Sequence, residues 1–190
     1  GNLLEYHATN GTSMASIYSY NAQIEIANII NANYSECAYV GFEDLDNVTG
    51  WYWYISCSEN QSITDSDSHT GKHSLEIISF ENASPWCYAA TKVFEAADLD
   101  LNSSYTFSAW IKAPAVHDEI GIRIKYETNT GWTKPALTEY TGAGEWQYIE
   151  CSLDLSTISG FIQLEPVIVN RGDNQIPGYF DDLRFHPTDA

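Results

Sequence analysis

Two adjacent carboxylates, Asp181 and Asp182, are the residues of this chain whose types and spacing most clearly suggest chemistry. They stand in the run GYFDDLRF (178–185), whose other members are mostly aromatic or aliphatic. Successive side chains of a β-strand point to opposite faces, so only one of the two can point freely outward. The other faces the interior, where an unpaired charge is too costly to keep. Because the chain has few basic residues, that carboxylate favours a metal ion as its partner.

A second interpretation of the same run remains open. One aspartate can face solvent while the other lies in the turn before the strand, and then neither carboxylate needs a metal. The spacing alone does not separate these two interpretations.

Zinc is not expected in this chain. His69 and His73 are four residues apart in HTGKH, but the central Thr-Gly argues against the helix that such a zinc pair needs. The cysteines are widely spaced, which excludes a zinc ribbon, and they permit two disulfides in any of three pairings or buried free thiols. These cysteines are Cys37, Cys57, Cys87 and Cys151.

The acidic composition limits the possible partners. The chain has 26 Asp and Glu against eight Lys and Arg, a formal net charge of −18. Such a field repels nucleic-acid phosphates and anionic membrane surfaces, and it attracts cations. No stretch is long and apolar enough for membrane insertion. No signal peptide is present, and because the chain starts at Gly1 a targeting segment could have been removed.

Enzymatic activity is not expected. A nucleophile elbow, a Ser/His/Asp setting and a phosphate loop are all missing from the sequence. Carboxyl groups are so frequent that a pair resembling a glycosidase site is expected by chance.

The elements that must position these residues are β-strands. The richness in aromatic and β-branched residues, with frequent Gly, Asn, Ser and Thr, predicts an all-β protein. Strands are predicted at 38–42, 51–57, 73–80, 86–94, 105–112, 120–127, 136–140, 146–153, 161–169 and 178–185. Several alternate cleanly, as in 105–112 and 120–127, where aliphatic or aromatic residues occupy every second position. This period predicts antiparallel sheets with one solvent-facing side.

Residues 1–37 have a different pattern. NLLEYH and SMASIYSYN flank Asn10-Gly11, which predicts a β-hairpin with a type I′ turn, and a further apolar run, IEIANII, follows. GNLLEYHATNG, YSYN and IANIINANY resemble the tail of a YD-repeat (Rhs-like) array of bacterial secreted proteins. This resemblance implies a longer extracellular polypeptide. An ordinary hairpin packed on the main domain is the alternative.

Six motifs occur in a fixed order in the remainder of the chain. They are GFED at 41–44, Trp51, HTGKHSL at 69–75, YTFSAWIK at 105–112, GEWQYIE at 144–150 and FDDLRF at 180–185. In this order they resemble a jelly-roll carbohydrate-binding module of the galactose-binding-like class. The resemblance implies a jelly-roll β-sandwich at 38–190, preceded by a β-hairpin extension at 1–37.

The same resemblance implies a structural calcium ion between the start and the end of the sandwich. Its ligands would be the carboxylate of Glu43, a backbone carbonyl of Gly71 or Lys72, and Asp181 or Asp182. Calcium takes six to eight oxygen ligands of these kinds. A bound ion would join the two ends of the domain and stabilise it by linkage.

Sugar binding requires aromatic rings for apolar sugar faces and polar groups for hydroxyls. The candidates are Trp86 after a proline, Trp110 between polar strand neighbours, and Trp132, which is expected at a loop tip. Arg123 lies on the polar face of the strand after that of Trp110 and could be beside it. Each of these tryptophans could instead be structural.

The sequence therefore predicts a non-catalytic carbohydrate-binding module of a secreted or cell-surface bacterial protein, with a glycan as partner and a structural Ca²⁺. The rival hypothesis is a structural or adhesion spacer of a large YD-repeat polypeptide. Such a spacer would contact neighbouring domains of a longer parent chain and would bind no small ligand.

Overall fold

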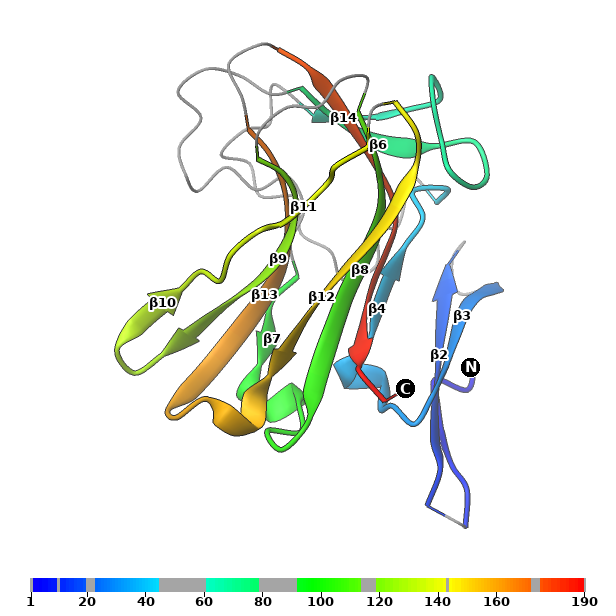
Figure 1. The fold of residues 1–190 in the computed structure, drawn as a ribbon. Helices are drawn as coiled ribbons and strands as arrows, with labels where there is room; N and C mark the ends of the chain where they lie inside the picture. Colours follow the sequence, from blue (N-terminus) through cyan, green and yellow to red (C-terminus); the bar gives the residue numbers. More distant parts are fainter. Residues whose placement is uncertain are drawn as a thin grey trace.

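The described residues form three antiparallel β-sheets (Figure 1). The computed structural model describes residues 2–9, 11–19, 23–44, 61–78, 92–113, 119–142, 144–171 and 175–189. Two larger sheets pack against each other as a sandwich, and a small N-terminal sheet lies beside one of them. The predicted all-β jelly-roll sandwich with an N-terminal hairpin is confirmed. Within the described ranges no helix is long and apolar enough to cross a membrane.

The larger sheet of the sandwich has six strands in the order β12-β8-β14-β6-β5, with β4 paired to β14. Its strands are β4 (Ala38–Val40), β5 (Gln61–Thr64), β6 (Ser74–Ile78), β8 (Ser104–Lys112), β12 (Gln147–Asp154) and β14 (Pro177–Pro187). The pairing of β14 with β4 places the start and the end of the sandwich side by side, with Leu183 opposite Val40.

The second sheet has five strands in the order β10-β9-β13-β7, with β11 paired to β9. They are β7 (Phe94–Glu95), β9 (Ile120–Thr128), β10 (Gly131–Thr133), β11 (Thr138–Glu139) and β13 (Phe161–Asn170). Short 3-10 helices among the described residues are η1 (Tyr34–Glu36), η3 (Ala96–Asp98) and η4 (Leu155–Thr157). The consecutive strands β8 and β9 therefore belong to different sheets.

The alternation seen in the sequence builds the core between the two sheets. On β8 the side chains of Tyr105, Phe107, Ala109 and Ile111 are fully buried, and Ile120, Ile122 and Ile124 face them from β9. Phe185 of β14 packs among these rings, 5.4 Å from Tyr105 between ring centroids. Burial of this apolar surface is the main favourable term in the stability of the sandwich.

The outer faces are less solvent-exposed than the alternation predicts. Ser108 on β8 is fully buried, and Lys125 on β9 is only 7% exposed. Lys125 is covered because its ammonium lies against the ring of Trp132, 4.4 Å from the centroid. On the same sheet Leu137 covers Val167 and Val169. Segments that fold back over the sheets thus bury positions that the period-two pattern assigns to solvent.

A β-bulge in β14 decides where the two adjacent carboxylates lie. Asp181 pairs with Trp110 and Arg184 pairs with Ser108, so Asp182 and Leu183 both stand opposite the single residue Ala109. Asp182 takes the left-handed backbone conformation, with φ 50°. Neither carboxylate reaches solvent, since Asp181 is 0% and Asp182 is 2% exposed. The expectation that one of them points freely outward is therefore wrong.

The N-terminal sheet has the order β1-β2-β3, with β1 (Glu5–His7), β2 (Ser13–Ser19) and β3 (Ile24–Ile30). The predicted hairpin forms, but not with a two-residue type I′ turn. The N–H of Ala8 donates to the Thr12 carbonyl and that of Gly11 donates to the Ala8 carbonyl, so the connection is longer. Gly11, with φ 90°, supplies the bulged position that such a connection uses.

Most predicted strands within the described residues are found, with small differences at their ends. The prediction at 136–140 shrinks to the two residues of β11, while β5 and β10 were not predicted. Trp132 lies in β10 rather than at a loop tip. The predicted strand 51–57 and most of 86–94 lie outside the described residues. Cys37 and Cys151 are free thiols, which excludes a pair of disulfides.

Candidate functional site

The loop that follows β5 is held by the two carboxylates of β14. Asp181 Oδ2 accepts hydrogen bonds from the backbone N–H groups of His69 and Thr70, each at 3.0 Å. Asp182 Oδ2 lies 3.2 Å from Nδ1 of His69 and from the hydroxyl of Thr70. Its Oδ1 accepts from the hydroxyl of Tyr39 at 2.6 Å. The bulge thus turns both carboxylates towards one loop and towards β4.

A third carboxylate, that of Glu43, holds the other half of the same loop. Glu43 Oε1 accepts from the N–H groups of Lys72 at 2.8 Å and His73 at 2.7 Å. Burial acts to raise the pKa of Glu43, but these two N–H groups together with the His73 side chain outweigh it and lower that pKa. We call Glu43, Asp181 and Asp182 the carboxylate clamp. It joins both ends of the sandwich to residues 69–73, as the family resemblance implied.

The two aspartates of the clamp hold negative charge away from water, with Asp181 0% and Asp182 2% exposed. Burial raises the pKa of Asp181 to about 6, and the neighbouring Asp182 adds to this effect. In the described part of the chain no Lys or Arg pairs with either aspartate, and the ion-pair partner of Asp182 is His69. Carboxylates and backbone carbonyls are hard oxygen donors, which are the ligands that calcium prefers. Among the described residues no group of three His, Cys, Asp or Glu side chains is close enough to form a ready-made metal site.

Replacing Gly71 with alanine is expected to lower the free energy of unfolding by roughly 2 kcal/mol. Gly71 has φ 64°, and an added Cβ would collide with the Glu43 carboxylate. Thermal or urea unfolding measures the effect. Gly144→Ala is the matched control, because Gly144 also has a positive φ but an added Cβ there meets no atom within 4 Å. Equal losses for both variants would show that the contact with Glu43 contributes nothing.

Trp110, a predicted sugar-binding residue, is packed against this loop on the outer face of the six-stranded sheet. Its ring stacks on His69, with 3.7 Å between centroids and 13° between planes. Tyr148 of β12 stands opposite Trp110 in the register of β12 and β8, with 5.7 Å between ring centroids, and His69 also contacts Trp146. The aromatic group therefore anchors the loop that the clamp binds.

The expectation that Arg123 lies beside Trp110 is wrong. β8 carries Trp110 in the six-stranded sheet, whereas β9 carries Arg123 in the five-stranded sheet. Both side chains point away from the core, so the whole sandwich separates them. The chain crosses between the sheets after β8, and a strand-by-strand reading of the sequence cannot detect this crossing.

Arg123 and Trp132 do share a face, the outer face of β9, β10 and β13. Trp132 stands opposite Glu127 in the register of β10 and β9, and its side chain is 36% exposed. Arg123 stands opposite Val167, and its guanidinium donates to the Pro135 carbonyl at 3.2 Å. Two of the four predicted sugar-binding residues are thus brought to one surface. Trp86 lies outside the described residues.

Polar side chains fill the rest of this surface. Lys125 and Glu165 stand directly opposite each other and form an ion pair of 2.6 Å. Gln163 donates to Glu127 at 2.5 Å. We call this surface the β9–β13 face; it consists of Arg123, Lys125, Glu127, Trp132, Gln163 and Glu165. It combines an exposed indole with groups that donate and accept hydrogen bonds.

The sequence reasoning missed Gln163 and Glu165 as candidate site residues. A signal was available, because Gln163 and Glu165 form a short polar row within 161–169, alternating with apolar Ile162, Leu164 and Pro166. The row becomes meaningful only once β13 is known to pair with β9.

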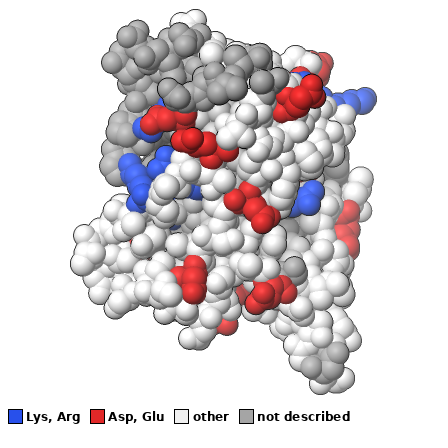
Figure 2. All heavy atoms as spheres, viewed as in Figure 1, with Lys and Arg blue, Asp and Glu red and all other residues white. Residues whose placement is uncertain are grey.

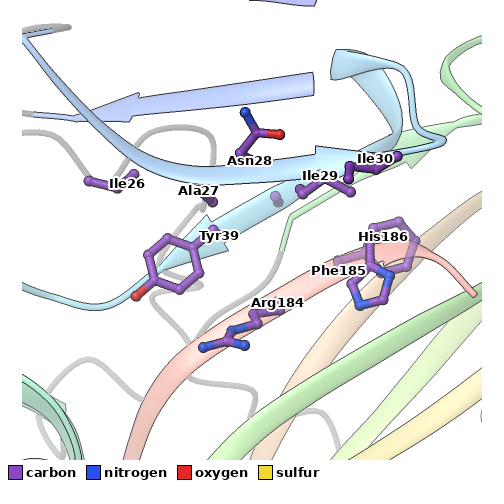
Figure 3. A pocket seen from close by; sticks show the side chains of 10 residues that line it. Ile26, Ala27, Asn28, Ile29, Ile30, Tyr39, Arg184, Phe185 and His186 are labelled. Atoms are coloured by element: carbon purple, nitrogen blue, oxygen red, sulfur yellow. The ribbon is translucent and has the colours of Figure 1, made fainter. Parts of the chain in front are cut away.

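A cleft of about 520 Å³ separates the N-terminal sheet from the six-stranded sheet. Figure 3 shows residues of β3 along one side and Tyr39, Arg184 and His186 of β4 and β14 along the other. Its lining combines aliphatic side chains, mostly of β3, with the ring of Tyr39 and the guanidinium of Arg184, which lies 5.8 Å from the centroid of that ring. The hydroxyl of Tyr39 is already bound to Asp182.

Comparisons with known proteins point to one class of molecule. A family model described as a carbohydrate binding domain matches residues 30–163. The C-terminal family 22 carbohydrate-binding module of a Clostridium thermocellum protein has a TM-score of 0.56 at 14% identity, covering 82% of this chain and 96% of that chain. A xylan-binding domain from Paenibacillus barcinonensis has a TM-score of 0.53 at 15% identity, covering 80% of this chain and 94% of that chain. At such identities the likeness to these structures concerns the fold. Among curated proteins none matches the chain.

Proposed function

The chain belongs to the carbohydrate-binding domain family, and we propose that it is a non-catalytic module that binds a polysaccharide on the β9–β13 face. The observation that carries the proposal is the exposed ring of Trp132 beside a row of donors and acceptors. Sugars offer apolar ring faces for stacking and hydroxyl groups for hydrogen bonds, so this combination suits them.

The outer face of the six-stranded sheet is less suited to a sugar. Trp110 is already stacked on His69, and its neighbour Asp181 is buried beneath the same loop. His69 occupies one face of the Trp110 ring, so a sugar that stacked on that face would have to displace the loop from its carboxylate partners. Trp110 is therefore a structural residue in this proposal, and Trp132 takes the binding role.

Replacing Trp132 with alanine is expected to weaken polysaccharide binding tenfold or more, about 1.4 kcal/mol or more of binding free energy. Affinity electrophoresis and calorimetry against soluble polysaccharides measure the loss. Xylan comes first among the ligands, because the Paenibacillus barcinonensis domain is a xylan-binding domain. Trp110→Ala is the matched control, with a lower melting temperature and unchanged affinity expected.

The opposite pattern, with binding lost in Trp110→Ala and kept in Trp132→Ala, would move the site to the other sheet. If the wild-type protein is retained by no polysaccharide, the proposed function is wrong.

The proposal includes a structural calcium ion at the carboxylate clamp. Glu43, Asp181 and Asp182 would supply carboxylate oxygens, and Gly71 or Lys72 would supply a backbone carbonyl. Support comes from the two buried aspartates, which have no Lys or Arg partner in the described ranges. The ion would add positive charge to this cluster and fix residues 69–73 against both ends of the sandwich.

The proposed location is outside the cell or on the surface of a bacterium, where polysaccharide ligands are found. The family match begins at residue 30, so most of the N-terminal sheet precedes it. For residues 1–37 the relation to a YD-repeat tail is part of the proposal, and the antiparallel β1–β3 sheet is compatible with it.

A second candidate function is a structural or adhesion spacer that contacts neighbouring domains of a longer parent chain. The observation that favours it is a set of exposed apolar side chains on or beside the N-terminal sheet. They are Leu3, Leu4, Tyr6, Ile24 and Ile30, each more than 40% exposed. Groups of exposed apolar residues mark interaction surfaces. The glycan-binding measurements above decide between this candidate and the first.

A further inference from the structure

Charged side chains reach solvent on the side of the molecule that carries β9 and β10. Figure 2 shows blue and red atoms at the left of the surface, the side on which these two strands lie in Figure 1. The Lys125–Glu165 pair of the β9–β13 face is different, because its two side chains are only 9% and 8% exposed. A ligand lying on this face would touch little of either side chain. Direct binding to a ligand therefore does not explain why an ion pair stands here.

The Lys125 ammonium lies between two groups that belong to different strands. Its Nζ is 2.6 Å from Oε2 of Glu165, the residue directly opposite on β13. On the side of β10 it lies 4.4 Å from the ring centroid of Trp132, which stands opposite Glu127 and is the diagonal neighbour of Lys125. The electron-rich face of an indole attracts a cation at this distance. Glu165 and Trp132 together fix the position of the ammonium.

The same contact fixes the orientation of the Trp132 ring. The strand β10 that carries it has three residues and, among the described strands, pairs with β9 alone. Cross-strand neighbours therefore support its side chains from one side. Trp132 is 36% exposed, and with the ammonium against one face of its ring a sugar is left the opposite face. A ring that already holds its bound orientation loses less conformational freedom when a ligand binds.

Stability of the fold gives a weaker reason for an ion pair at this position. Both ions lose their hydration when they are buried, so apolar side chains of similar size often stabilise a protein equally well or better. An apolar side chain in place of Lys125 would still pack beside the indole, but it would lack the charge that attracts the ring face. The chemistry of a lysine held by a glutamate is thus better matched to the ring than to the core.

We infer that Lys125 is a positioning residue of the polysaccharide site: fixed by Glu165, its ammonium holds the Trp132 ring in the orientation in which the opposite ring face receives a sugar. This inference rests on the proposed function and gives the buried ion pair a part in it. Glu127 and Gln163 are only half-buried and are joined by a hydrogen bond of 2.5 Å. They remain as the polar groups that meet sugar hydroxyl groups.

A double-mutant cycle on binding affinity tests the inference with the full chain. The probe is the soluble polysaccharide that retains the wild type most strongly, with xylan tried first. Lys125→Met/Glu165→Gln removes both charges, so that no unpaired carboxylate stays buried. This variant is expected to bind about threefold to tenfold more weakly than the wild type, because the ring must then be ordered on binding. In a Trp132→Ala background the same change should alter affinity by less than about twofold, because no ring is left to position.

A conservative variant and a matched control give readouts that a purely structural role would not reproduce. Lys125→Arg keeps a cation that pairs with a carboxylate and stacks on an indole, so its affinity should stay within about twofold of the wild type. Lys112→Met is the control, because Lys112 also forms an ion pair, 2.7 Å from Asp67, but on the six-stranded sheet. Its affinity should be unchanged. If melting curves show that Lys125→Met/Glu165→Gln is unfolded, Lys125→Gln, whose amide can still donate to Glu165, replaces it.

The ring can also be observed without a ligand. In protein labelled with 5-fluorotryptophan, the fluorine resonance of Trp132 is the one that disappears in Trp132→Phe. This resonance is expected to shift and broaden in Lys125→Met/Glu165→Gln, because the ring then samples several orientations. It should be unaffected in Lys112→Met.

Equal affinity of the wild type and Lys125→Met/Glu165→Gln overturns the inference and leaves the proposed function standing. An equal loss of affinity with and without the Trp132 ring also overturns it, because the ion pair would then contact the sugar directly. A fluorine resonance that does not respond to the loss of Lys125 contradicts it as well. If no polysaccharide binds to the wild type, the proposed function is wrong and the inference is wrong with it.

Discussion

Chelation of calcium is expected to lower the melting temperature of the wild-type protein by roughly 10 °C, and millimolar calcium should restore it. An ion present at about a thousand times its dissociation constant stabilises the folded state by about 4 kcal/mol. In a domain of this size each kcal/mol shifts the melting temperature by about 2–4 °C. Differential scanning calorimetry with EDTA, and then with excess calcium chloride, measures the shift.

The physical reason lies in the carboxylate clamp. Asp181 and Asp182 are adjacent and buried, and the pKa of Asp181 is raised to about 6 because its charged form has lost water. The N–H groups of His69 and Thr70 stabilise that charge in part. A divalent cation would supply the remainder and would lock the loop onto both ends of the sandwich.

Substitutions separate the contribution of the ion to stability from the contribution of the hydrogen bonds. Asp181→Asn removes one of two neighbouring charges, so its melting temperature in EDTA should equal or exceed that of the wild type. Its response to calcium should be lost. Asp65→Asn is the control, because Asp65 is exposed on the same loop and should behave like the wild type. A wild-type melting curve that ignores both EDTA and calcium would reject the calcium site and leave the backbone N–H groups as the only partners of the clamp.

Replacing Glu36 with alanine is expected to lower the free energy of unfolding by about 3 kcal/mol, roughly 6–12 °C in melting temperature. Glu36 is 5% exposed and accepts four hydrogen bonds. Its Oε1 accepts from the Tyr105 hydroxyl at 2.6 Å and the Asp100 N–H at 3.1 Å. Its Oε2 accepts from the N–H of Asn33 at 3.0 Å and from its side-chain amide at 2.7 Å.

The loss of stability is large because the Tyr105 hydroxyl cannot form a replacement hydrogen bond to water. Its side chain is fully buried, and burial, followed by the hydrogen bond to Glu36, raises the pKa of its hydroxyl. Without Glu36 the buried hydroxyl still accepts from the Asp100 N–H at 2.8 Å, but its proton loses its best acceptor, at 2.6 Å, and the only other acceptor among the described residues is the Asp100 carbonyl at 3.4 Å. The contacts of Glu36 also join η1, at the end of the N-terminal segment, to the loop before β8. Removing its carboxylate should therefore destabilise η1 and that loop.

A double-mutant cycle with Tyr105→Phe measures the coupling between the two side chains by urea unfolding. Tyr105→Phe alone should cost less than Glu36→Ala, because Glu36 then keeps its other donors. Glu25→Ala is the matched control, since Glu25 is exposed on β3 and its loss should change stability by no more than about 0.5 kcal/mol. A Glu36 variant as stable as this control would contradict the assigned role.

Much of the fold could be predicted from the sequence because strand periodicity is local. The alternation in 105–112 identified Tyr105 and Ile111 as core residues, and both are fully buried. The first apolar runs of the sequence predicted the N-terminal hairpin. The turn between them is longer than the two-residue turn that Asn10-Gly11 predicts. Turn geometry depends on which pair of residues closes the ladder, and the dipeptide alone does not fix that pair.

The candidate site could be predicted only in part, because its residues come together through long-range pairing. Glu43, the loop at 69–73 and the aspartates of β14 do lie together, as the ordered motifs implied. Trp110 and Arg123 do not, since β8 and β9 belong to different sheets. The polar strand neighbours of Trp110 predict an open ring, but His69, distant in the sequence, stacks on it.

By itself the sequence determined the all-β class, the residues that alternate into the core, and the strong negative charge. The tertiary structure alone decided that the bulge in β14 buries both Asp181 and Asp182, and that Trp110 and Arg123 lie on different sheets. The physical reason is that side-chain alternation follows from the geometry of one strand. Sheet membership, register and the loops that cover a sheet depend on contacts between residues far apart along the chain.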